Sequence, residues 1–207
     1  MGLALFLLFG VSQLFVDQLR MERAQVARQD GQQAGRLALR YLAYAVRGSG
    51  QASCPGHESF ATVSGDTGVR GWSSPEIPEA LDDRDVSENG DVLRVFDSRA
   101  CDSAAPLRVW YYLSRRGGDS DNPLALFRRE DHAASQEMIE GVLAMRFRFG
   151  VEAEPGTGHV SRWLRSDDVA DWHTVIAVRV WLTVDGGVDT APLDYRATYA
   201  VRGGRWL

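Results

Sequence analysis

The residues that could carry out catalysis or metal binding are spread along the chain without a recognisable site pattern. The histidines form neither a His-Glu-x-x-His motif nor a ligand pair at helical spacing. No Cys-x-x-Cys motif occurs, and no glycine-rich phosphate loop follows a strand-like segment. Acidic clusters at 82–85 and 167–168 offer paired carboxylates, although such clusters are usually solvated loops. The sequence therefore predicts no enzyme and no cofactor; the histidines are His57, His132, His159 and His173.

The segment GGDSDNP, residues 117–123, contains oxygen donors of the kind that Ca²⁺ prefers. Asp119, Asp121 and Asn122 supply these donors, but the segment lacks the full twelve-residue pattern of a calcium-binding loop. We interpret it as a hairpin turn, and a calcium site near Asp119–Asn122 is the alternative.

The composition limits the classes of partner. The formal net charge is −5 and the arginines are scattered, which disfavours nucleic acid as the main partner. Trp163, Trp172 and Trp206 could anchor a partner protein, since tryptophan is enriched at the residues that dominate interface energies. Packing in the core or at its rim is the alternative for each of them.

An apolar run opens the chain, and its length lies between that of a buried helix and that of a membrane span. A cleaved signal peptide is disfavoured because no basic residue precedes the run. A buried core helix is disfavoured because the run is apolar on all sides. We therefore expect a membrane helix that begins before Met1, with residues 1–16 as its end. Its apolar residues are Leu3, Leu5, Phe6, Leu7, Leu8, Phe9, Val11, Leu14, Phe15 and Val16.

The same helix is predicted to continue to about Arg47, because no proline occurs before Pro55 and GSG follows at 48–50. Gly31 and Gly35 are expected to weaken it locally. Its last part carries a one-sided apolar stripe, which we expect to pack on the chain's own sheet. We divide the chain into a helix over 1–47 and a globular, β-rich domain over 48–207. The stripe consists of Ala34, Leu37, Ala38, Tyr41, Leu42 and Ala45.

Strand signals fill the second half of the chain, whereas residues 64–91 look like long surface loops. In most of the strand segments, apolar residues alternate with polar ones, a pattern typical of an antiparallel sheet with one covered and one wet side. The expected fold is α+β, with one long helix laid across one antiparallel sheet. The strand segments are 92–96, 107–113, 124–130, 143–151, 174–184 and 195–201.

Several stretches follow one another in a distinctive order: the apolar helix ending in GQQAGRLALRYLAYAVRGSG, Cys54 after it, LALFRRE, EMIEGVLAMRFRFGVE, WHTVIAVRVWLTV and YRATYAVRGG. In this order they resemble the PilW family of type IV pilus minor pilins. The family also begins with a short basic leader and Gly-Phe-Thr-Leu-x-Glu, which this chain lacks. We expect that the start codon was assigned too far downstream and that an in-frame leader precedes Met1.

The resemblance implies a pilin-like fold whose apolar helical half protrudes from the globular domain. It implies a minor pilin that primes pilus assembly and enters the fibre at or near its tip. Such a protein waits in the bacterial inner membrane with its domain in the periplasm, and then becomes part of a cell-surface pilus. Its implied partners are other minor pilins and the major pilin through helix–helix packing, the inner membrane, and a tip adhesin.

A periplasmic location would also place Cys54 and Cys101 in an oxidising compartment, so we expect them to form a disulfide. Two unpaired thiols are the alternative.

Two other protein classes remain open. A J-type minor pseudopilin of a type II secretion system shares the long helix and the sheet. A single-pass periplasmic sensor or ligand-binding domain would not need the helix to continue unbroken into the domain. Small residues in the apolar run, Ala4, Gly10 and Ser12, would allow close helix packing in a pilus but also fit ordinary composition.

Overall fold

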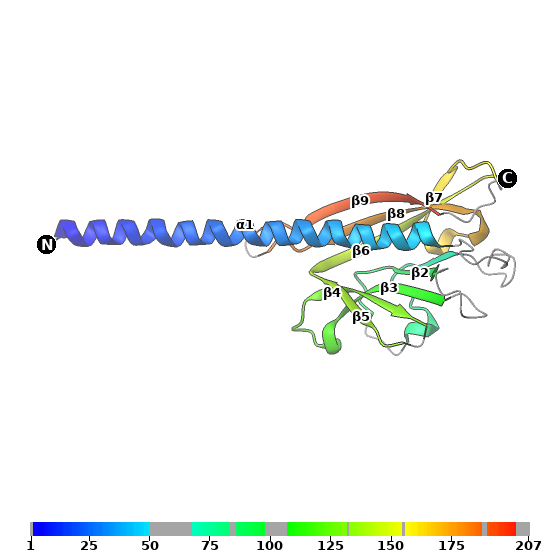
Figure 1. Cartoon of the computed structure of the whole chain (residues 1–207), viewed down its shortest axis with the longest axis horizontal. Coiled ribbons are helices and arrows are strands. Elements are labelled where there is room, and N and C mark those ends of the chain that lie inside the picture. The colour runs from blue at the N-terminus through cyan, green and yellow to red at the C-terminus, as the bar shows by residue number, and fades with distance from the viewer. Residues whose placement is uncertain are drawn as a thin grey trace.

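The computed structural model has an α+β fold in which one N-terminal helix is combined with two antiparallel sheets (Figure 1). It describes residues 2–49, 68–82, 86–97, 107–131, 133–154, 156–187 and 190–201. For residues 2–12, 14 and 16 it describes the helical backbone but not the side chains. The α+β class predicted from the sequence is thereby confirmed.

Helix α1 (Gly2–Gly48) is continuous over 47 residues, as the absence of proline predicts. At 1.5 Å per residue it is about 70 Å long. Its N-terminal half extends away from both sheets, and its C-terminal half lies between them (Figure 1). The helix ends where the Ser49 hydroxyl donates a hydrogen bond to the Val46 carbonyl over 2.6 Å.

The first sheet has the strand order β1-β2-β3-β4-β5, so each strand pairs with its neighbour along the chain. Both of its faces are covered: one packs toward α1, and the other packs against a loop whose short 3-10 helix, Glu79–Leu81, buries Leu81. The expected wet side was wrong for this sheet, because central strand β3 is apolar on both faces, as in VWYYL. The strands are β1 (Val69–Trp72), β2 (Val92–Asp97), β3 (Leu107–Arg115), β4 (Leu124–Glu130) and β5 (Gln136–Glu140).

The second sheet has the order β7-β6-β8-β9 and shows the predicted alternation. Phe147, Phe149 and Val180 are among the side chains that this sheet buries against the helix and the first sheet. The residues between them in sequence, such as Arg148 and Arg179, point to the outer face. The strands are β6 (Val142–Val151), β7 (Arg162–Leu164), β8 (Val175–Val184) and β9 (Leu193–Ala200).

The single sheet expected from the sequence is thus two sheets, and the chain passes between them at Gly141. This residue has a φ of 80°, which glycine adopts without steric cost and which turns the chain from β5 into β6. The buried carboxylate of Asp91 links the two sheets by accepting a hydrogen bond from the Phe147 amide over 2.8 Å. Both sheets and the C-terminal half of α1 share one hydrophobic core.

Candidate interaction surface of the N-terminal helix

One side of α1 packs closely against the second sheet, and the residues at the closest contacts are glycine and alanine. A Cβ atom on Gly31 would overlap the backbone oxygen of Asp185, and a Cβ atom on Gly35 would overlap the ring of Tyr195. Near the point where the helix leaves the sheets, a Cβ atom on Gly187 would overlap Ala27. The glycines that were expected to weaken the helix are therefore contact points that let its backbone approach the β8–β9 loop and β9.

A polar contact fixes the position of the helix along β9. The hydroxyl of Tyr199 donates a hydrogen bond to the main-chain carbonyl of Leu39 over 2.9 Å. The guanidinium of Arg47 lies over the same ring, 5.5 Å from its centroid. Burial raises the pKa of the Tyr199 hydroxyl, and the positive charge of Arg47 partly offsets this effect. The hydroxyl therefore remains a hydrogen-bond donor at neutral pH.

The six residues of the predicted packing stripe do not all face the sheets. Ala38 and Leu42 are fully buried, and Ala34 and Ala45 are partly buried against the core. Leu37 and Tyr41 are exposed instead, and Val46 joins the buried side. The buried face is rotated from the predicted one because the close approach requires Gly31, Gly35 and Ala38 at the contact, which moves the larger side chains outward.

The exposed side of α1 carries a second apolar stripe. At about 100° per residue, its members fall on one side of the helix, away from the buried face. Each has between 36% and 63% of its side-chain surface exposed. Large apolar residues at helical spacing on an open face are typical of a surface that binds another helix. The members of this open stripe are Phe15, Leu19, Val26, Leu37, Tyr41 and Tyr44.

The apolar run at the start of the chain is only partly described. Its backbone is helical, and Phe15 is exposed. The side chains of the other predicted members, Leu3, Leu5, Phe6, Leu7, Leu8, Phe9, Val11, Leu14 and Val16, lie outside the described set. Within the part of the chain that is described, no helix has an apolar stretch long enough to cross a membrane. The membrane helix expected to begin before Met1 stays a prediction.

The other residues singled out in the sequence do not form a site among the described residues. Cys54, Cys101, His57 and His132 lie outside the described ranges. Residues 117–123 form the turn between β3 and β4, where the Asp119 carboxylate accepts a hydrogen bond from the Asp121 amide over 3.0 Å. No group of three or more metal-binding side chains occurs within the described ranges.

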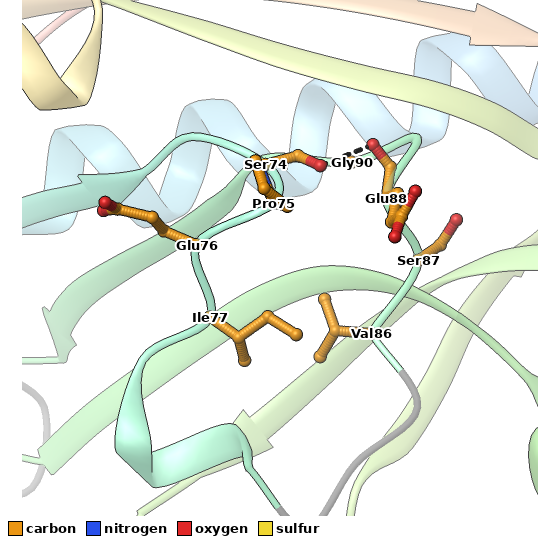
Figure 2. Close-up of a pocket in the computed structure, with 8 residues that line it drawn as sticks. All are labelled: Ser74, Pro75, Glu76, Ile77, Val86, Ser87, Glu88 and Gly90. Atoms are coloured by element: carbon orange, nitrogen blue, oxygen red, sulfur yellow. Dashed lines mark hydrogen bonds between the residues drawn. The ribbon is translucent and has the colours of Figure 1, made fainter.

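A small pocket lies between two loop segments on the covered side of the first sheet (Figure 2). The Ser74 hydroxyl donates a hydrogen bond to the Glu88 carbonyl over 2.7 Å. Glu76 points away from the pocket, and Ile77 faces Val86 across it. These contacts join the two loop segments to each other.

Sequence reasoning missed the open stripe even though its signal was present. Leu19, Val26 and Tyr44 are spaced at seven and eighteen residues, close to whole numbers of helical turns. The charges around Leu19 and Val26 concealed the pattern, because residues 17–33 look polar when the helix is read as a whole.

One family match was found. The model of the family described as "PilW: Type IV Pilus-assembly protein W" matches residues 110–205, which run from β3 through β9. The match confirms the resemblance to the PilW family and supports a role in type IV pilus assembly, and with it an association with the cell envelope. No significant match to a curated protein or to a solved structure was found.

Proposed function

Because residues 110–205 match the PilW family, we propose that this chain is a minor pilin of a type IV pilus. In this role it primes pilus assembly and enters the fibre at or near the tip through α1. The role is structural rather than enzymatic. The open stripe of α1 is the observation that carries the proposal, since a helix-based fibre subunit needs an apolar helix face that its own domain leaves uncovered.

The occupant of the open stripe is the N-terminal helix of a neighbouring pilin. From Phe15 to Tyr44 the stripe covers 29 residue steps, or about 44 Å of helix. Helices that pack along such a length bury a row of large side chains, and each buried apolar side chain contributes about 1.5–3 kcal/mol. The outer part of the stripe, from Phe15 to Val26, is exposed and lies on the half of α1 that extends away from the sheets (Figure 1).

The globular domain and the N-terminal apolar segment have different roles in this proposal. The domain over 48–207 folds around the second half of the helix and faces the periplasm before assembly. The apolar segment over 1–16 interacts with the inner membrane and later with the fibre core. Other minor pilins and the major pilin are the helix partners, and a tip adhesin is a further candidate.

The test is to place charges on the open stripe in cells. A double variant, Leu19→Asp with Val26→Asp, is expressed in a strain lacking the gene, and surface pili are counted by electron microscopy. We expect the variant to accumulate to wild-type level by immunoblot but to restore few or no pili. Burying two uncompensated carboxylates in a helix–helix contact would cost several kcal/mol.

A matched control uses Gln18→Asp with Gln25→Asp, which adds the same charge to neighbouring exposed positions outside the stripe. The control should restore pili. If the stripe variant restores pili as well as the control does, the stripe does not pack against another helix. If the wild-type gene itself fails to restore pili, the minor pilin role is wrong.

A further inference from the structure

We propose that the outer face of the second sheet binds an acidic surface of another protein in the pilus-assembly complex, through Arg148, Arg179 and Arg196. The inference rests on the proposed function for the identity of the complex, but its chemistry follows from the sheet alone. We call these three arginines, together with Trp163 and Trp181, the arginine face.

The tryptophan rings hold the arginines in place. Arg179 lies 3.9 Å from the centroid of the Trp163 ring and 5.9 Å from that of Trp181. Arg196 and Arg148 lie 5.2 Å and 6.0 Å from the same Trp181 ring. A guanidinium over an aromatic ring retains in-plane N–H groups that can donate to a carboxylate. Trp163 has room for this arrangement because it lies opposite Gly150, whose missing side chain leaves space for the ring.

The arrangement carries an electrostatic cost within the isolated chain. Arg148 on β6 is directly opposite Arg179 on β8, and like charges at directly opposite positions destabilise a sheet. Within the described part of the chain, none of the three arginines forms an ion pair with a carboxylate. Arg179 donates to the Thr198 hydroxyl over 3.3 Å, and Arg148 to the Phe147 carbonyl over 3.0 Å. Both of these acceptors are neutral.

Among the described residues, two charged side chains of the same sheet are engaged with other partners. Arg146, the next arginine along β6, is engaged with the buried Asp91, 3.3 Å away. Asp194 at the end of β9 accepts a hydrogen bond from the Thr183 hydroxyl over 2.7 Å. Three cations thus lie on one outer face of the sheet, where Arg196 is exposed and Arg148 and Arg179 are partly exposed. A set of partner carboxylates would stabilise this arrangement.

The observations favour a protein over a long polyanion. The whole chain has a net charge of −5, so a nucleic acid or an anionic membrane would be repelled by the rest of the surface. An acidic patch of matching size would contact only the arginine face. Arginine and tryptophan are also the residues most often responsible for the binding energy of protein interfaces.

The test compares a triple variant of the arginine face with a charge-matched control. The variant is Arg148→Gln with Arg179→Gln and Arg196→Gln. The control is Arg28→Gln with Arg70→Gln and Arg108→Gln, at exposed positions outside both the arginine face and the open stripe. Each full chain is titrated against fluorescein-labelled deca-glutamate, with deca-glutamine and oligothymidylate as comparison probes. Each is also expressed in the strain lacking the gene, and pili are counted.

We expect the wild type and the control to bind deca-glutamate in preference to both other probes, with an affinity that falls as salt rises. The triple variant should bind it about tenfold more weakly, because three charge-assisted hydrogen-bond donors are lost. Unchanged thermal unfolding of the variant shows that its fold is intact. In cells the triple variant should restore fewer pili than the control.

Three results would overturn the inference: equal binding of deca-glutamate by variant and wild type, tighter binding of oligothymidylate that the variant loses, or full piliation by the variant. The last result, with normal piliation by the wild type, leaves the minor pilin role intact. If the wild type restores no pili, the proposed function fails, and the peptide titration alone decides whether the arginine face binds an acidic polypeptide.

Discussion

The two sides of α1 differ at the points where the helix backbone comes closest to another element. The side that faces the sheets has Gly31, Gly35 and Ala38 where the helix backbone comes closest, and the side that faces outward has Leu37, Tyr41 and Tyr44. A contact within one folded chain can be made close and permanent by small residues. A contact that forms only when another subunit arrives needs apolar area that is still exposed. Glycine and alanine at the points of closest approach thus mark the contact within the chain, and large apolar residues that stay exposed mark the side available to another subunit.

The largest expected effect comes from placing the same charge on each side. Leu42→Asp introduces an unpaired carboxylate at a fully buried position and should lower the free energy of unfolding by about 4 kcal/mol or more. Leu37→Asp, on the open side, should lower it by less than about 1 kcal/mol. Chemical denaturation of the two variants measures the difference. Equal destabilisation would mean that both sides of the helix pack within the domain.

A smaller effect is expected from adding one methyl group at the close contact. Gly31→Ala places a Cβ atom against the Asp185 carbonyl, and the amide of Asp185 is held by the Gly141 carbonyl over 2.7 Å. The overlap should cost about 1–2 kcal/mol even after the gain in helix propensity. Gly48→Ala is the control, since a Cβ atom there would meet nothing within 4 Å. A stabilised Gly31→Ala variant in thermal unfolding would show that the helix can move away from the sheet at low cost.

The contact between Tyr199 and the helix should depend on pH. The folded-state pKa of Tyr199 is raised by burial above the unfolded value of about 10. The contribution of the protonated hydroxyl is therefore complete below pH 10 and is lost as the pH rises through the folded-state pKa. Tyr199→Phe should cost about 1 kcal/mol at neutral pH and should reduce the loss of stability above pH 10. Identical alkaline unfolding curves for the two proteins would contradict this assignment.

The smallest effect on stability is expected from trimming the protruding stripe. The double variant Leu19→Ala with Val26→Ala replaces two exposed side chains by alanine, which has the highest helix propensity. The free energy of unfolding should therefore change by less than about 0.5 kcal/mol. Differential scanning calorimetry of the variant and the wild type measures the change in unfolding temperature. A clear drop in the unfolding temperature would place these residues against the domain and would remove the main support for their role in subunit contacts.

The sequence predicted the α+β class, the unbroken helix and the longer strands, because each depends on local periodicity. Strands β1, β5 and β7 were missed because they are short and acquire strand geometry only by pairing with a longer neighbour. Residues 136–140 contain two glutamates among five residues, a composition that predicts no strand on its own.

The orientation of the helix was harder to predict, for a physical reason. A helix with apolar residues on two sides has two candidate packing faces, and periodicity alone does not say which one its own sheet covers. Leu37 and Tyr41 were assigned to the inner face because they fall at helical spacing in one apolar stripe with Ala38 and Leu42. The close contacts at Gly31 and Gly35 depend on the positions of Asp185 and Tyr195, which are more than 150 residues away along the chain.

The joint between α1 and the second sheet also determines how the chain bears a mechanical load. The contacts from Ala27 to Arg47 are distributed along the helix, and Gly35 and Leu39 meet Tyr195 and Tyr199 in the same order along β9. A pull along the helix axis therefore loads these contacts together, in shear. A sideways pull on the protruding half would load first the contact at Ala27 and Gly187, and would open the joint one contact at a time. The attachment of the helix thus resists a pull along the helix axis better than a sideways pull, and a subunit drawn lengthwise into a fibre, as proposed above, would need this property.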